Sequence, residues 1–192
     1  MLVQNEMIKS AMKKILFITG NPNKLREAKS IIPELEGFDI DLPEIQELDT
    51  KKIIELKLYE AIKQKPATEL IVEDQSLTID GMNGLPGPFI KWFNKSLKMD
   101  GLYKLALKMG NQSTEAKTTI GYCDKNGKIK FFEATIKGKI VSPRGNIGWG
   151  WDYVFQPKGH KKTFAQMTME QKNELSMRMI ALKKLKKYLK LK

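Results

Sequence analysis

The sequence is poor in the residues on which most metal clusters and many hydrolases depend. Its 192 residues include one cysteine, Cys123, and one histidine, His160. One thiol cannot form an internal disulfide or a cysteine-rich metal cluster, and one imidazole excludes a histidine-rich zinc site. The G-x-S-x-G motif of serine hydrolases is also absent. We therefore expect neither zinc nor serine–histidine chemistry, and we predict that Cys123 lies in a strand and His160 in a loop.

Long hydrophobic runs are missing as well. No apolar segment approaches the roughly 20 residues that cross a bilayer. Residues 1–14 lack the uninterrupted apolar region of a secretion signal. We expect a cytoplasmic protein without a membrane partner.

Acidic residues are outnumbered by basic ones. The chain has 34 Lys and Arg against 22 Asp and Glu, which gives a net charge of +12. Such a surplus attracts partners that carry phosphate, either nucleotides or nucleic acid. The densest basic stretch, 183–192, is interleaved with leucines and has almost no aromatic side chains. This pattern favours a helix with a solvated lysine face over a dedicated nucleic-acid patch.

The apolar patterns indicate one α/β domain. Nothing suggests a boundary, so we predict a single domain over 1–192, with residues 1–12 as an N-terminal extension. Strands are expected at 15–19, 38–43, 69–74, 115–123, 128–136 and 153–155. Helices are expected after Asn21, over 49–65, 90–98 and 101–109, and as one last helix from Thr168. Helices interspersed with strands favour a mixed sheet with flanking helices.

The turn "TGNPNK" at 19–24 joins the first strand to the first helix. Asn21 precedes Pro22, which predicts Asn21 as the N-cap and Pro22 as the first helical residue. The backbone N–H groups of Asn23 and Lys24 would then point out of the helix start, where an anion is favoured. Gly20 would let a ligand approach closely, although the same turn also serves as an ordinary structural joint.

Carboxylates follow two of the expected strands. Glu73 and Asp74 are expected to end the strand at 69–74, and Glu44 lies just after 38–43. Carboxylate oxygens can hold Mg²⁺ or accept a proton from an attacking water. The alternative for Glu73 and Asp74 is that one caps a turn and the other pairs with a surface lysine.

Aromatic and basic residues follow near the C-terminus. Trp149 or Trp151 could stack on a base while Asp152 accepts an N–H from its edge, or the tryptophans could simply fill the core. Lys172 and Arg178 lie on the expected last helix, where they could receive phosphates or face water.

Together these segments resemble the inosine triphosphate pyrophosphatase family. The matching motifs run from about Lys13 to Tyr188: "TGNPNK" (19–24), "DLPE" (41–44), "VED" (72–74), "GLPGPFIKWF" (84–93), "GWGWD" (148–152) and "KNELSMR" (172–178). The resemblance implies an elongated mixed sheet with helices that form two lobes around a central cleft, usually in a homodimer. It also implies Mg²⁺-dependent hydrolysis of aberrant purine nucleoside triphosphates (ITP, dITP and XTP) to the monophosphate and pyrophosphate, with no requirement for nucleic acid.

The resemblance also implies roles for individual residues. Glu44 and Asp74 become metal ligands, and Asp74 is also the base that activates water. The substrate-binding residues become Thr19, Gly20, Asn21, Pro22, Asn23, Lys24, Lys57, Gln75, Lys91, Trp149, Gly150, Trp151, Asp152, Lys172, Met177 and Arg178.

Three positions depart from the family pattern. Met177 stands where the family has histidine, Gln75 where it usually has a small hydroxyl residue, and Trp149 where phenylalanine is common. Methionine cannot donate the hydrogen bond that imidazole offers to a purine carbonyl, so we expect a weaker preference for 6-oxo purines. Two alternatives stay open: a basic nucleic-acid-binding protein that has lost catalysis, and a house-cleaning pyrophosphatase for pyrimidine triphosphates.

Overall fold

The computed structural model describes residues 14–191, which form a mixed α/β structure around one sheet. The predicted extension at 1–12 lies outside the described residues. The sheet order is β2-β1-β3-β5-β6-β7, and β4 pairs with β3 beside this path. β1 is parallel to β2 and β3, whereas the pairs β3–β5, β5–β6 and β6–β7 are antiparallel. The predicted mixed sheet with flanking helices is therefore confirmed.

The first unit is the predicted strand, turn and helix. β1 (Ile15–Ile18) leads into α2 (Pro22–Lys29), and β2 (Leu35–Phe38) returns beside β1. Asn21 is the N-cap and Pro22 is the first helical residue, as predicted. The strand expected at 38–43 is wrong, because β2 ends at Phe38. β1 is only four residues long, so β2 has no partner strand beyond that point.

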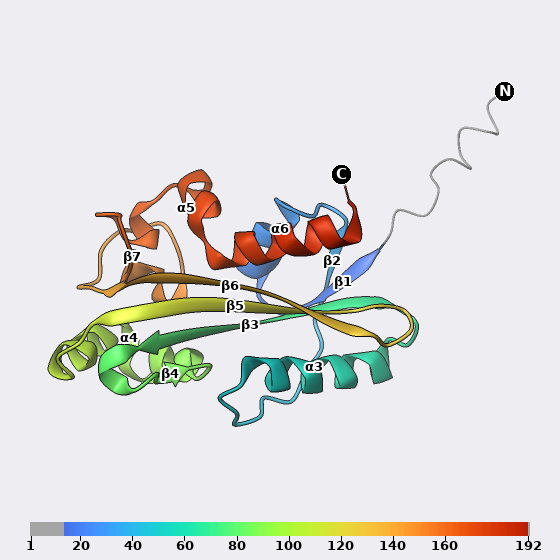
Figure 1. Cartoon of the computed structure of the whole chain (residues 1–192), viewed down its shortest axis with the longest axis horizontal. Helices are drawn as coiled ribbons and strands as arrows, with labels where there is room; N and C mark the ends of the chain where they lie inside the picture. The colour runs from blue at the N-terminus through green and yellow to red at the C-terminus, as the bar shows by residue number, and fades with distance from the viewer. Residues whose placement is uncertain (1–13, 192) are drawn as a thin grey trace.

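Three long strands form the axis of the molecule (Figure 1). They are β3 (Glu69–Ile79), β5 (Ser113–Cys123) and β6 (Ile129–Ile140), and the last two make the predicted hairpin. β1 and β2 flank one end, while β4 (Pro86–Gly87) and β7 (Phe155–Pro157) flank the other. The expected strand end at Asp74 is wrong, because β5 pairs with β3 all the way to Ile79.

Helices cover both faces of this sheet. α3 (Thr50–Gln64) packs Ile54 and Leu58 against Leu70 and Val72 of β3 on one face. α2 and α6 (Met177–Leu189) cover the other face, where the larger core includes Ile71. Because side chains alternate along a strand, successive residues of β3 point into different layers.

The remaining helices close the end of the sheet near β4 and β7 (Figure 1). They are α4 (Ile90–Lys108), α5 (Met169–Leu175) and the 3-10 turns Asp80–Met82, Gly150–Tyr153 and Phe164–Gln166. α4 is kinked at Lys98, which separates the two short helices that were expected. The single last helix is wrong: Ser176 is extended, ends α5 and caps α6 with its hydroxyl oxygen, which accepts from the N–H of Met179.

Cys123 is buried at the end of β5, and His160 lies in an exposed loop, as predicted. Across residues 14–191, no helix is both long enough and apolar enough to cross a membrane.

Candidate active site

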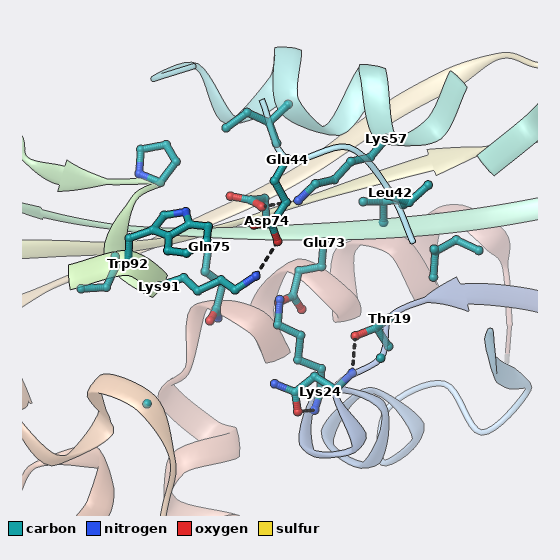
Figure 2. Close-up of a pocket in the computed structure, with 18 of the residues that line it drawn as sticks. Thr19, Lys24, Leu42, Glu44, Lys57, Glu73, Asp74, Gln75, Lys91 and Trp92 are labelled. Carbon is teal, nitrogen blue, oxygen red and sulfur yellow. Dashed lines mark hydrogen bonds and ion pairs between the residues drawn. The ribbon is translucent and has the colours of Figure 1, made fainter. Parts of the chain in front are cut away.

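A cleft opens where β1 ends and β3, still paired with β5, continues beyond it. Figure 2 shows Thr19 and Lys24 on one side of it and Glu44, Lys57, Asp74 and Lys91 on the other. Its volume is about 570 Å³, in the range of small-molecule sites. The predicted site residues that line it are Thr19, Gly20, Asn21, Lys24, Glu44, Lys57, Asp74, Gln75, Lys91, Trp149, Gly150 and Trp151.

A second, much smaller cavity adjoins this cleft. It measures about 10 Å³ and shares Gln75, Trp149 and Trp151 with the cleft. Its other walls are predicted site residues and the cap of α6: Asp152, Lys172, Ser176, Met177 and Arg178. Of the predicted residues only Pro22 and Asn23 line neither space, because they form the first turn of α2 behind the cleft wall.

The turn at 19–24 differs from expectation in one respect. The N–H groups of Asn23 and Lys24 donate to the side-chain oxygen of Asn21, at 2.9 and 3.4 Å, and so do not point freely into the cleft. The Asn21 N–H donates to the Thr19 hydroxyl at 3.1 Å. The attraction of this turn for an anion therefore comes from the ammonium of Lys24 and the helix dipole. A Cβ on Gly20 would lie 2.6 Å from a carboxylate oxygen of Asp39, so a larger residue here would require the exposed Asp39 side chain to turn away.

Two carboxylates in the cleft are each paired with a lysine. Lys57 Nζ lies 3.0 Å from Asp74 Oδ1, and Lys91 Nζ lies 2.6 Å from Glu44 Oε1. Burial raises the pKa of Asp74, and the charge of Lys57 opposes that rise only in part. The hydrogen bond from Lys91 lowers the pKa of Glu44. A buried carboxylate with a raised pKa is well suited to accept a proton.

The fit of these carboxylates to Mg²⁺ can be tested on the donor set. Within residues 14–191, no group of three or more His, Cys, Asp and Glu side chains is arranged to hold a metal ion. Glu44 and Asp74 nevertheless border the same cleft, and both offer hard oxygen ligands. Mg²⁺ is usually bound by one or two carboxylates together with substrate phosphates and water. The residues therefore fit an ion that arrives with a polyphosphate, rather than one held by the protein alone.

Glu73 belongs to a different layer from its neighbour Asp74. It points toward α2 and α6, where Arg178 donates to it through Nε at 2.7 Å and through Nη2 at 3.0 Å. Lys24 Nζ lies 3.3 Å from the same carboxylate. Burial opposes ionisation of Glu73, but the charges of Arg178 and Lys24 outweigh it and lower the pKa to about 2. Glu73 is therefore a buried, ionised carboxylate held by two cations.

The network continues toward the small cavity. Arg178 also donates to Glu27 of α2, and Lys172 Nζ lies 3.1 Å from Glu27 and 2.7 Å from Asp152. Three carboxylates and three cations thus alternate: Glu27, Glu73 and Asp152 with Lys24, Lys172 and Arg178. The charges cancel, which is the condition under which a buried cluster of ions is tolerated.

Trp149 covers this network on the side of the cleft. Its indole N–H donates to Glu27 at 3.3 Å, and its ring lies 5.1 Å from the Arg178 guanidinium and 5.6 Å from Lys172 Nζ. Trp151 is buried against Phe155 and Phe164. The two tryptophans therefore have different surroundings. Trp151 fills the core, while Trp149 is half-buried with its ring at the cavity.

Sequence reasoning missed Glu27 and underrated Glu73. Lys24 and Arg178 were assigned to the substrate, but their cations are bound to these two carboxylates. One signal was available for Glu73: it follows the three apolar residues 70–72 of a strand expected to be buried, where a carboxylate must be paired. Glu27 gave no such signal, since a glutamate in a short helix is usually solvated.

Known proteins resemble this chain in both sequence and fold. Residues 15–188 match the Ham1 family. An inosine triphosphate pyrophosphatase of Schizosaccharomyces pombe is 41% identical over 182 residues, covering 93% of this chain and 96% of the relative. The one of Saccharomyces cerevisiae is 38% identical over 191 residues, covering 92% and 95%.

Solved structures give the same result. The Ham1 protein of Staphylococcus aureus superposes with a TM-score of 0.79 at 26% identity, covering 93% of this chain and 98% of that one. A nucleoside-triphosphatase, or dITP/XTP pyrophosphatase, of Mycobacterium abscessus gives a TM-score of 0.68 at 25% identity, covering 90% and 98%. The match in sequence spans the cleft residues from the turn at 19–24 to Arg178, and on this ground the chain belongs to the Ham1 family.

Proposed function

We propose that the protein is a nucleoside triphosphate pyrophosphatase. It hydrolyses aberrant purine nucleotides, namely ITP, dITP and XTP, to the monophosphate and pyrophosphate, and so cleanses the nucleotide pool. The observation that carries this proposal is the arrangement of the cleft: lysines and two carboxylates at one end, and a tryptophan-lined cavity at the other. A chain of the Ham1 family with such a cleft can bind the two ends of one nucleotide.

The triphosphate end is served by Lys24, Lys57 and Lys91, together with the N-terminus of α2. A triphosphate carries several negative charges, which must be neutralised before an electron-rich oxygen can approach phosphorus. Glu44 and Asp74 would hold Mg²⁺ beside these lysines, and the ion when bound supplies further neutralisation. The lysines that now pair with Glu44 and Asp74 would turn toward the phosphates.

Asp74 is the proposed general base. Its carboxylate accepts a proton from water as the water oxygen bonds to the α-phosphorus, and the bond from that phosphorus to the pyrophosphate oxygen breaks. The raised pKa of Asp74 brings its basicity closer to neutral pH, and Lys57 at 3.0 Å orients the carboxylate. The leaving pyrophosphate keeps the negative charge, which the lysines of the cleft stabilise.

The base is proposed to bind at the Trp149 end. Gly150 and Asn21 line the cleft, and Lys172, Asp152, Met177 and Arg178 surround the small cavity, which at about 10 Å³ would have to widen to admit a purine. Met177 is 3% exposed and presents a thioether where an imidazole would be a donor. We therefore propose that discrimination between 6-oxo and 6-amino purines is weaker than in relatives with histidine.

The proposals on oligomeric state and location rest on the resemblance to the inosine triphosphate pyrophosphatase family. We propose that the protein is a homodimer and that it works in the cytoplasm, where nucleotide pools need cleansing. Light scattering of the purified protein tests the first, because a monomeric mass would contradict it. Cell fractionation tests the second.

A panel of nucleotides tests the reaction. The protein is incubated with Mg²⁺ and, separately, ITP, dITP, XTP, ATP, GTP and the pyrimidine triphosphates, and pyrophosphate is measured. We expect pyrophosphate and the monophosphate from the first three substrates. Free phosphate as the first product would refute a pyrophosphatase, and a preference for pyrimidine triphosphates would make the protein a different house-cleaning enzyme. Asp74→Asn serves as the inactive control.

A further inference from the structure

α6 carries two very different faces. Met179, Leu182 and Leu185 are buried against the sheet. The opposite side carries a surface that we call the C-terminal basic face. It consists of Lys183, Lys184, Lys186 and Lys187 of α6, the C-cap residue Lys190, and the adjacent Lys130 of β6. No Asp or Glu follows Glu174 in the sequence, so this side of the helix has charge of one sign.

Exposure to water alone does not explain why lysines without acidic partners gather on one side of α6. On other elements, Lys51, Lys63 and Lys117 lie within 3.1 Å of a carboxylate. Among the described residues, no lysine of the C-terminal basic face makes an ion pair, and Lys184 instead donates to the backbone oxygen of Glu133. Lysines four residues apart, such as Lys183 and Lys187, repel each other, whereas a helix exposed only to water gains from mixed signs. An external polyanion would relieve this repulsion.

An exposed aromatic ring lies at the edge of the same face. Tyr188 packs against Phe132 and Tyr122, with ring centroids 5.4 and 6.0 Å away, yet it is 42% exposed. Lys130 Nζ lies over this ring, 4.2 Å from its centre, so a base that stacks on that face takes the place of the lysine. Aromatic rings beside lysines are the usual platform on which single-stranded nucleic acids stack a base.

We propose that the C-terminal basic face binds single-stranded nucleic acid, with the lysines on the phosphates and Tyr188 under a base. A membrane fits less well, because Leu182 and Leu185 are buried and Leu189 is partly buried against the core, which leaves little apolar surface on this helix to insert. The lysines begin more than one helical turn after Arg178, so the face lies outside the cleft and the binding is independent of the proposed hydrolysis. It would hold the enzyme near nucleic acid without using its active site.

Salt dependence of binding provides the test. Anisotropy of a labelled single-stranded oligonucleotide is measured over a range of KCl concentrations. Each phosphate contact contributes about 0.7 to the slope of log K against log salt, so K183Q/K187Q/K190Q should reduce the slope by about 2. The matched control is K158Q/K161Q/K162Q, which removes the same charge from an exposed loop and should leave the slope unchanged. Both variants should hydrolyse ITP like the parent protein.

A second variant separates stacking from charge. Y188L keeps an apolar contact with Phe132 but removes the ring, and it should weaken binding several-fold without changing the slope. Equal losses in the two triple variants would overturn the proposal, because binding would then reflect net charge alone. So would an absence of oligonucleotide binding, or competition in which vesicles of anionic lipid displace the oligonucleotide. A protein that fails to hydrolyse ITP but passes these tests would refute only the proposed catalysis.

Discussion

Replacing Glu73 with glutamine tests how the candidate site is held together. The Glu73 side chain is 1% exposed and is bound by Arg178 through two hydrogen bonds and by Lys24 through an ion pair. Glutamine has nearly the same shape but no charge. In the variant, Arg178 keeps Glu27 as its only carboxylate, and one buried cation is left without full compensation.

The size of the effect follows from the pKa of Glu73. That pKa is about 2 in the folded protein against a reference of 4.5, a difference that corresponds to about 3 kcal/mol at 1.36 kcal/mol per unit. Because the folded-state pKa is lowered, this stabilisation is fully present above pH 4.5 and is lost as the pH falls toward 2. We expect Glu73→Gln to lower the free energy of unfolding by about 3 kcal/mol at pH 7, within the usual range for breaking a buried pair.

Urea unfolding at a series of pH values measures this effect. The difference between parent and variant should be constant from pH 7 to about 4.5 and shrink below that. Glu60→Gln is the matched control, because Glu60 pairs with Lys63 at 2.6 Å on the surface and its loss should cost at most about 0.5 kcal/mol. A difference that does not depend on pH, or one no larger than the control, would refute the assignment of Glu73 as an ionised buried carboxylate.

Three further predictions concern the cleft. Asp74→Asn should lower ITP turnover at least about 100-fold. The thermal stability of this variant at pH 7 should stay equal or rise, because burial disfavours the ionised Asp74. A variant that keeps most of its activity would remove Asp74 from the mechanism. Met177→His should raise the ITP-to-ATP turnover ratio by restoring a donor, and an unchanged ratio would contradict the role given to position 177. Trp149→Phe keeps an aromatic ring but loses the hydrogen bond from the indole N–H to Glu27. The free energy of unfolding, measured in urea, should therefore fall by about 1–2 kcal/mol. An unchanged free energy of unfolding would contradict this hydrogen bond.

The elements with local signals were predictable from the sequence. Asn21 before Pro22 marks a helix start by the chemistry of its own residues, and the Asn-Gly turn marks the β5–β6 hairpin. The end of β3 was not predictable in this way. Its last five residues are held by pairing with β5, which lies some forty residues away in the chain. The same holds for Ser176, whose extended backbone breaks a pattern that otherwise continues as one helix.

The order of the sequence motifs predicted most of the residues that border the cleft, but not the side chains with which those residues pair. Lys24, Lys172 and Arg178 were predicted to meet the substrate, and each borders one of the two cavities. Their ion pairs with Glu27, Glu73 and Asp152 join five elements that meet only in the folded chain, namely α2, β3, the turn Gly150–Tyr153, α5 and α6. No spacing in the sequence carries that information, because the separation of the paired residues varies from 20 positions for Lys172 and Asp152 to 151 for Arg178 and Glu27.

The alternation of side chains along β3 explains how neighbouring carboxylates take different roles. Glu73 faces α2 and α6, where Arg178 neutralises it, while Asp74 faces α3 and the cleft, where Lys57 is its partner. Lys24 is the link between the two layers, because it pairs with Glu73 and also lines the cleft. If Lys24 turned to the phosphates, Arg178 would still hold Glu73 through two hydrogen bonds, but the same guanidinium also neutralises Glu27. Without Lys24 the buried network would hold three carboxylates against two cations, so Lys24 would have to stay close enough to Glu73 to offset one net negative charge.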